Sequence, residues 1–81
     1  MPKVVLEDND FTDGSIDILN LLVTAKMAAS RSEARRAVEQ GGVSVNNEKV
    51  TDIKMAYTKE DINKEDFIVK KGKKTFMKIE A

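Results

Sequence analysis

The sequence predicts a small α+β domain that combines a helical hairpin with short strands and a C-terminal β-hairpin. Three observations support this prediction. An almost wholly apolar stretch at residues 16–26 is soon followed by a basic helical pattern at 30–40. Two glycines end that pattern and lead into a short strand at 43–46. β-branched and aromatic residues then recur over 67–79 around a central glycine, which is typical of a hairpin.

Residues 1–14 are predicted to be an acidic linker or arm that precedes a domain at 15–81. The segment has no hydrophobic period, and Asp13-Gly14 is a typical turn pair. Its apolar residues could nevertheless dock on the domain; they are Val4, Val5, Leu6 and Phe11.

The first helix is expected over 16–26, with Ser15 as its N-cap. Its polar residues form only a narrow strip, made of Asp17, Asn20 and Thr24. A helix that is apolar on most sides is buried on most sides, so we place this helix at the centre of the core.

The second helix begins at Ser30, where S-x-x-E forms a capping box. The Ser30 oxygen would accept the Glu33 amide, and the Glu33 carboxylate would reach back to the Ser30 amide. At 100° per residue the apolar positions Ala34, Ala37 and Val38 fall on one side, opposite Ser32, Arg36 and Glu39, with Arg35 at the edge. Gly41 suits the left-handed residue that follows a helix end.

The two helices should form a compact hairpin, because only residues 27–29 join them and small alanines permit close approach. Beyond the strand at 43–46, Asn46-Asn47 is predicted to form a turn, since asparagine tolerates positive φ. The chain would return through Lys49-Val50, and one helical turn is expected at 58–61.

The C-terminal hairpin is predicted to pair residues 67–70 with 75–79. A Gly72-Lys73 turn would place Val69 opposite Phe76 and Ile68 opposite Met77, which matches apolar residues with one another. This turn would gather four lysines at the tip of the hairpin: Lys70, Lys71, Lys73 and Lys74.

The composition argues against catalysis, metal binding and a cofactor. The 81 residues include no cysteine and no histidine, so thiolate ligands, imidazole ligands and the usual general base at neutral pH are missing. The acidic pairs Asp8/Asp10 and Glu65/Asp66 are expected to be solvated surface. No apolar run reaches the roughly 20 residues of a membrane span, and the N-terminus has no signal-peptide pattern, so a cytoplasmic protein is expected.

The net charge of zero conceals a segregation of charge along the chain. Residues 1–25 carry a net charge of −4 and residues 50–66 one of −2, whereas residues 26–49 carry +2 and residues 67–81 carry +4. A nucleic acid would encounter the two basic blocks together if folding brings them side by side. Aromatic residues are few, and Phe67 and Phe76 occupy predicted core positions, so binding by charge and shape is favoured over base stacking.

Each basic group also has a purely structural explanation. The arginines of the second helix could pair with Glu33 and Glu39 on a solvated face, and lysines often protect strand edges. The combination of an arginine helix and a lysine-rich hairpin in one small domain favours RNA binding.

The segment SRSEARRAVEQGGVSVNNEKVTD, residues 30–52, resembles the alpha-L RNA-binding motif, also called the S-four domain. Together with FIVKKGKKTFMKI at 67–79, it resembles the C-terminal domain of bacterial-type tyrosyl-tRNA synthetases. The resemblance implies two antiparallel helices on a small, mostly antiparallel sheet that ends in a hairpin. Lys26 stands where glycine is usual in this family, so the first helix is expected to end in a less relaxed way.

The resemblance further implies a non-catalytic domain that binds tyrosine-specific tRNA at its variable arm and anticodon stem for a separate catalytic domain. The isolated domain would be monomeric. The RNA-binding residues implied are Arg31, Ser32, Arg35, Arg36, Gln40, Asn46, Lys49, Lys71, Lys73 and Lys74. Two alternatives remain open: an appendage of an RNA-modifying enzyme such as a pseudouridine synthase or a ribosome-associated RNA-binding protein, and a protein-interaction module.

Overall fold

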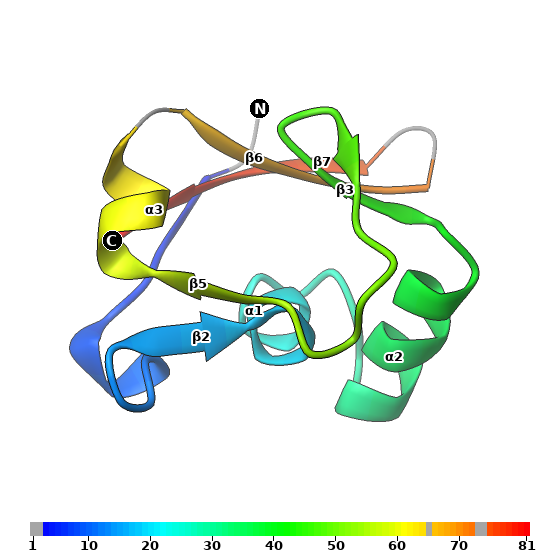
Figure 1. The fold of residues 1–81 in the computed structure, drawn as a ribbon, viewed down its shortest axis with the longest axis horizontal. Coiled ribbons are helices and arrows are strands. Elements are labelled where there is room, and N and C mark those ends of the chain that lie inside the picture. The colour runs from blue at the N-terminus through cyan, green and yellow to red at the C-terminus, as the bar shows by residue number, and fades with distance from the viewer. Residues whose placement is uncertain (1–2, 65, 73–74) are drawn as a thin grey trace.

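The computed structural model describes residues 3–64, 66–72 and 75–81, which fold into an α+β domain, as the sequence predicts. A five-stranded sheet has the order β1-β7-β6-β3-β4, and a second sheet pairs β2 with β5 (Figure 1). The strands are β1 (Lys3–Val5), β2 (Ser15–Asp17), β3 (Val43–Val45), β4 (Glu48–Lys49), β5 (Ala56–Thr58), β6 (Phe67–Lys71) and β7 (Thr75–Glu80). The helices are α1 (Ile18–Thr24), α2 (Arg31–Glu39), α3 (Lys59–Lys64) and the short 3-10 helix η1 (Asp8–Asp10).

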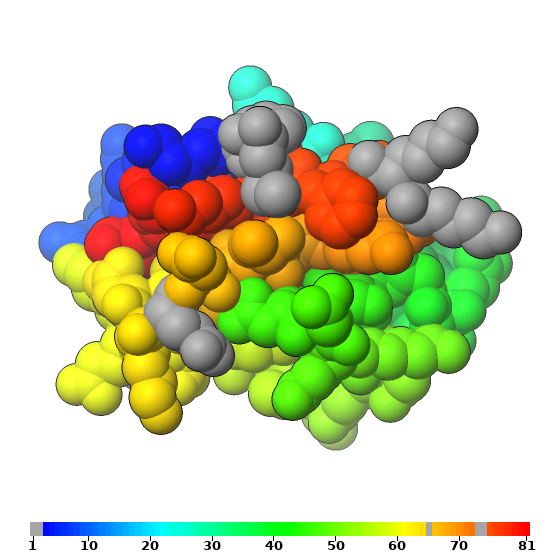
Figure 2. All heavy atoms as spheres, turned by 90° about the horizontal axis from the view of Figure 1, so that it is seen from above, coloured from blue at the N-terminus to red at the C-terminus, as the bar shows by residue number. Residues whose placement is uncertain are grey.

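The five-stranded sheet is covered on one face only. Helix α1 and the β2–β5 pair lie beneath this face, with α2 at one end of the molecule and α3 at the other (Figure 1). No helix or strand of the described residues crosses the opposite face, where β1, β7, β6 and β3 lie side by side (Figure 2). Within the described part of the chain, this broad sheet surface therefore has no covering layer.

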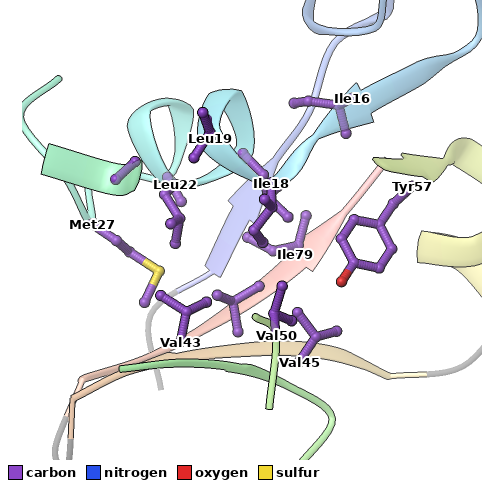
Figure 3. Packing of buried hydrophobic residues seen from close by; sticks show 14 of the residues in the cluster. Ile16, Ile18, Leu19, Leu22, Met27, Val43, Val45, Val50, Tyr57 and Ile79 are labelled. Carbon is purple, nitrogen blue, oxygen red and sulfur yellow. The ribbon is translucent and has the colours of Figure 1, made fainter. Parts of the chain in front are cut away.

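The core lies between α1 and the covered face of the sheet. Ile18 and Leu22 of α1 point toward Val43 and Ile79 of the sheet (Figure 3), and each of these four side chains is at most 1% exposed. Burial of this apolar area is the main stabilising contribution to so small a domain. The prediction that the first helix is the central core element is confirmed.

The first segment of the chain contributes to this sheet. Strand β1 pairs in parallel with β7, and the Leu6 amide donates a hydrogen bond of 2.7 Å to the Glu80 carbonyl oxygen. Leu6 is buried in the core, so part of the acidic segment docks on the fold. The division of the chain into an arm at 1–14 and a domain at 15–81 stays a prediction.

Helix α1 is shorter than predicted, and its predicted cap was wrong. Ser15 does not cap it, because Ser15–Asp17 is extended and pairs with β5. The N-cap is Asp17, whose Oδ1 accepts a hydrogen bond of 2.6 Å from the Asn20 amide. Helix α1 then ends at Thr24, and Lys26 adopts a left-handed backbone with φ of 59°. The expected unrelaxed helix end is therefore observed.

The predicted register of the C-terminal hairpin was wrong by one residue. Val69 pairs with Met77 and Lys70 pairs with Phe76, and the last pair of the hairpin is Lys71 with Thr75. A slip of one residue turns a strand over. The predicted register would have placed Lys78 on the covered face, whereas the observed one places Ile79 there, opposite Phe67.

The register also corrects the expected placement of the aromatic residues. Phe67 is buried as predicted, and its ring meets that of Tyr57 edge to face at 5.0 Å between centroids. Tyr57 therefore belongs to the core, although the sequence did not place it there. Phe76, predicted to be a core residue, is 37% exposed on the open face of the sheet.

The shorter predictions for turns and local structure agree with the structure. Asn46 and Asn47 both have positive φ, at 50° and 70°, and close the β3–β4 hairpin as a two-residue turn. The helical turn expected at 58–61 is the start of α3. Across residues 3–64, 66–72 and 75–81, no helix combines the length and apolar character required to span a bilayer.

Candidate nucleic-acid interface

The start of α2 is held by a variant of the predicted capping box. Ser30 Oγ accepts a hydrogen bond of 3.3 Å from the Glu33 amide, as expected. The Glu33 carboxylate, however, accepts from the Ala29 amide at 3.1 Å and not from that of Ser30. The Ala29 hydrogen bond, followed by the Lys71 ammonium, holds the pKa of Glu33 below its ordinary value of 4.5. This carboxylate therefore serves the fold as a stably charged anchor.

The end of α2 is closed by two glycines. The Gly41 amide donates to the Val38 carbonyl oxygen and the Gly42 amide to that of Ala37, which is the hydrogen-bond pattern of a Schellman motif. Gly41 has a φ of 74°, a conformation that favours glycine. The Lys49 side chain crosses this glycine so closely that an added Cβ would lie 2.3 Å from Lys49 Cε.

Arg31 connects the beginnings of the two helices. Its guanidinium lies 3.3 Å from Asp17 Oδ2 and also donates to Asn20 Oδ1. Asp17 is the N-cap of α1, so this arginine fixes α2 against the first turn of α1. Arg31 was predicted to contact RNA, and in this structure part of its hydrogen-bonding capacity serves the helix pair.

The solvent-facing side of α2 forms a shallow basic depression, which we call the α2 face. It is lined by Ser32, Arg35, Arg36, Glu39 and Gln40, all exposed. Arg35 Nε donates to Glu39 Oε1 at 2.9 Å, one turn along the helix. Arg36 makes no ion pair with any residue that the structure describes. The apolar side of the same helix is buried at Ala34 and Val38, so the predicted division of its faces is confirmed.

The C-terminal hairpin lies directly beside this helix. Lys71 Nζ is 3.4 Å from Glu33 Oε1 and also donates to the Met27 carbonyl oxygen. The Gly72 amide donates a hydrogen bond of 2.7 Å to the Gly42 carbonyl oxygen, just beyond the end of α2. A groove lined by Lys26, Gln40, Lys71, Gly72 and Thr75, among others, runs between the helix and the hairpin. Gln40 belongs to both this groove and the α2 face, so the two basic segments share one surface.

Two residues that were predicted to bind RNA, Asn46 and Lys49, lie outside the α2 face and the groove beside it. Asn46 Oδ1 accepts a hydrogen bond of 2.8 Å from the Ile68 amide, so its side chain joins the turn to β6. Asn46 and Lys49 line a separate groove, beside β5 and α3. Only Lys49 also reaches the end of α2, through its contact with Gly41. Lys73 and Lys74 lie outside the described residues.

The predicted set of site residues omits the side chains that hold the basic residues in place. Asp17 orients Arg31, and Glu33 orients Lys71. The S-x-x-E pattern marked Glu33 as a cap, but no local pattern links it to a lysine 38 residues away. In the part of the chain that the structure describes, no three carboxylates gather as metal ligands.

Comparisons with known proteins show to which family the chain belongs. The model of the family described as tyrosine--tRNA ligase SYY-like C-terminal domain matches residues 1–79. A tyrosine--tRNA ligase of Lachnoclostridium phytofermentans is 46% identical over 77 residues, which cover 94% of this chain and 18% of that protein. Corresponding proteins of Clostridium tetani and Clostridium botulinum (strain Loch Maree / Type A3) are 42% and 38% identical, over 98% of this chain and 19% of theirs.

The chain thus spans about a fifth of the length of the curated relatives that it matches. The family model covers nearly all of the chain, including the segment that forms β1 and η1. On this match, the chain belongs to the family of tyrosine--tRNA ligase SYY-like C-terminal domains.

Proposed function

We propose that this domain binds tyrosine-specific tRNA and positions it for aminoacylation by a separate catalytic domain of a tyrosine--tRNA ligase. The contact would be made to the long variable arm and the nearby part of the anticodon stem. Family membership and the names of the relatives support a place in such a ligase. The parent enzyme would work in the cytoplasm, and this domain alone would be monomeric and non-catalytic.

The observation that carries the proposal is the junction of the α2 face with the base of the β6–β7 hairpin. Arg35 and Arg36 stand exposed on the helix, and Gln40 extends their surface into the groove that contains Lys71. Guanidinium groups bind phosphate oxygens through two parallel hydrogen bonds, and an RNA backbone offers phosphates at regular spacing. An exposed basic helix face beside a basic hairpin suits a structured RNA that is read by shape and charge.

The proposed roles follow from these positions. Arg35 and Arg36 bind phosphates, whereas Ser32 and Gln40 donate hydrogen bonds to the sugar–phosphate backbone. Lys71, Lys73 and Lys74 extend the contact along the hairpin, and the last two enter the proposal from the sequence alone. Arg31 and Lys49 border this surface at the two ends of α2. Asn46 would contribute through the shape of its turn.

The proposal is tested by titrating labelled tRNA with the 81-residue chain over a series of salt concentrations. An Arg35→Ala/Arg36→Ala variant should weaken binding and reduce the slope of log K against log salt by roughly 1.4 to 1.8, because two phosphate contacts are lost. A Lys73→Ala/Lys74→Ala variant should have a similar effect. The control is Lys59→Ala/Lys64→Ala, which removes the same charge from α3 at the far end of the molecule (Figure 1).

Two results would contradict the proposal. Equal loss of affinity in the α2 and α3 variants would indicate non-specific attraction by net charge. A wild-type protein that binds no tRNA would favour a protein-interaction module. Preference for tyrosine tRNA over a tRNA with a short variable arm should be modest in this domain, because contacts to phosphates carry little sequence information.

A further inference from the structure

The open face of the five-stranded sheet carries its own ordered set of side chains, which we call the outer sheet face. Because side chains alternate along a strand, residues paired across the sheet share one face. Val43, Val45, Phe67, Val69 and Ile79 occupy the covered face and are buried. The outer sheet face therefore consists of Lys3, Val5, Ser44, Ile68, Lys70, Phe76, Lys78 and Glu80.

Phe76 is the exposed aromatic residue of this face. It is 37% exposed and lies opposite Lys70 across the β6–β7 pair. Lys70 Nζ lies 5.3 Å from the centroid of the Phe76 ring, within the range of a cation–π contact. Lys70 in turn pairs with Ser44 of β3, which pairs with Lys49 of β4. A solvent-exposed ring thus has one lysine directly beside it, in a row that continues through Ser44 to β4.

The other charges of the face are already paired. Lys3 lies 3.4 Å from Glu80, and Lys78 lies 3.6 Å from Asp66. Lys70 makes no ion pair with the residues that the structure describes. The unpaired positive charge of the outer sheet face is therefore that of Lys70, which lies directly beside Phe76.

This combination favours a nucleic acid over a protein as the occupant. Lysine is depleted at the centres of protein–protein interfaces, whereas an aromatic ring flanked by lysines on an open sheet is a common way to bind an unpaired nucleotide. The base stacks on the ring, and the lysines neutralise the phosphates on either side. Binding by charge and shape, as proposed for the α2 face, makes no use of such a ring.

We propose that the outer sheet face around Phe76 is a second RNA-binding surface, on which an unpaired base stacks on Phe76 while Lys70 binds an adjacent phosphate. This second surface presupposes the proposed RNA-binding function, and it adds the unpaired nucleotide as a class of ligand. Phe76 lies one residue from Thr75, which lines the groove beside α2. One RNA could therefore contact both surfaces around the base of the hairpin.

A fluorescence experiment tests stacking directly. The chain has no tryptophan, so a Phe76→Trp variant carries a single indole at the proposed site. A mixed-sequence single-stranded RNA should quench this indole on binding, because a stacked base is in contact with it. The blunt duplex formed from the same strand and its complement should quench it much less.

Affinity measurements separate this proposal from the function on which it rests. Phe76→Leu should weaken binding of the single-stranded RNA about 5- to 100-fold, with an unchanged salt slope because no charge is removed. Duplex binding should change less than about twofold. Val5→Ala is the matched control, because it shortens an apolar side chain that is 59% exposed on the same face but carries no ring. Thermal melts should confirm that both variants are folded.

Three results would overturn the proposal. The first is that Phe76→Leu binds single-stranded RNA as tightly as wild type does, while Arg35→Ala/Arg36→Ala still weakens tRNA binding. This result would overturn the second surface and leave the proposed function intact. A wild-type chain that binds neither RNA would overturn both. Tryptophan emission that shifts with protein concentration in the absence of RNA would show that a second copy of the chain covers the face.

Discussion

Lys71 Nζ lies 3.4 Å from Glu33 Oε1, although 38 residues separate the two in the chain. The same carboxylate caps the start of α2 through the Ala29 amide, and the same ammonium donates to the Met27 carbonyl oxygen. One ion pair thus joins the helical hairpin to the C-terminal β-hairpin. Its two members lie in the two segments that are proposed to bind RNA, so a change at this pair should affect both stability and the proposed binding.

Acid should weaken the domain through Glu33. Its pKa is lowered in the folded protein, so the unfolded chain takes up a proton first as the pH falls through 4.5. The stabilisation is complete above that value and is lost as the pH approaches the lower folded pKa. Urea unfolding at a series of pH values should therefore show wild type more stable than Glu33→Gln at pH 7, with the difference vanishing in acid. A difference that stays constant with pH would contradict this, and Glu60→Gln on exposed α3 is the control at pH 7.

Leu22→Ala should cost about 2–5 kcal/mol of unfolding free energy, because it opens a cavity at a fully buried site between α1 and the sheet. In an 81-residue domain, this loss approaches the whole stability. Thermal melts measure the effect. Val23→Ala on the same helix removes a half-buried side chain and should cost less, so equal losses would argue against α1 as the core element.

Ser30→Ala should destabilise the domain by about 1 kcal/mol, because the Glu33 amide loses its acceptor at the first turn of α2. Ser30→Asp supplies another good capping oxygen and should retain most of the stability. Chemical-denaturation midpoints measure both. An unchanged midpoint in Ser30→Ala would show that the hydrogen bond contributes nothing to stability.

Substitutions at the C-terminal ends of α1 and α2 should change stability in opposite directions. Both ends have the Schellman pattern, with Lys26 in the left-handed position after α1 and Gly41 in that position after α2. Lys26→Gly should relieve backbone strain and stabilise the domain by about 0.5–1 kcal/mol.

Gly41→Ala should destabilise the domain by about 1 kcal/mol, because its φ is 74°, a conformation that strains any residue with a Cβ; the end of the Lys49 side chain would also have to move aside. Unfolding midpoints of both variants test the pair. Destabilisation by Lys26→Gly would show that the Lys26 side chain contributes more than its backbone conformation costs.

The sequence alone determined most of the local structure and the division of α2 into an apolar and a basic face. The S-x-x-E cap, the double-glycine stop and the paired asparagines act through backbone groups a few residues away, so their patterns can be read without a fold. The helical period is also a local property, and it correctly predicted that Ala34 and Val38 lie on the buried side of α2, away from the arginines. The placement of Lys73 and Lys74 at the tip of the hairpin stays a prediction from the sequence.

Only the tertiary structure decided which distant residues meet. The partners of Arg31 and Lys71 lie 14 and 38 residues away, and no local pattern specifies such pairs. Residues 15–17, which were predicted to begin the first helix, are extended because they pair with β5. This pairing outweighed the local preference of Ser15 for a helix cap. The hairpin register was decided by which residues the sheet had to bury, and local matching of apolar pairs gave the wrong answer. That one-residue difference turned Phe76 out to solvent, because the side chains of a strand alternate between a covered face and an open one.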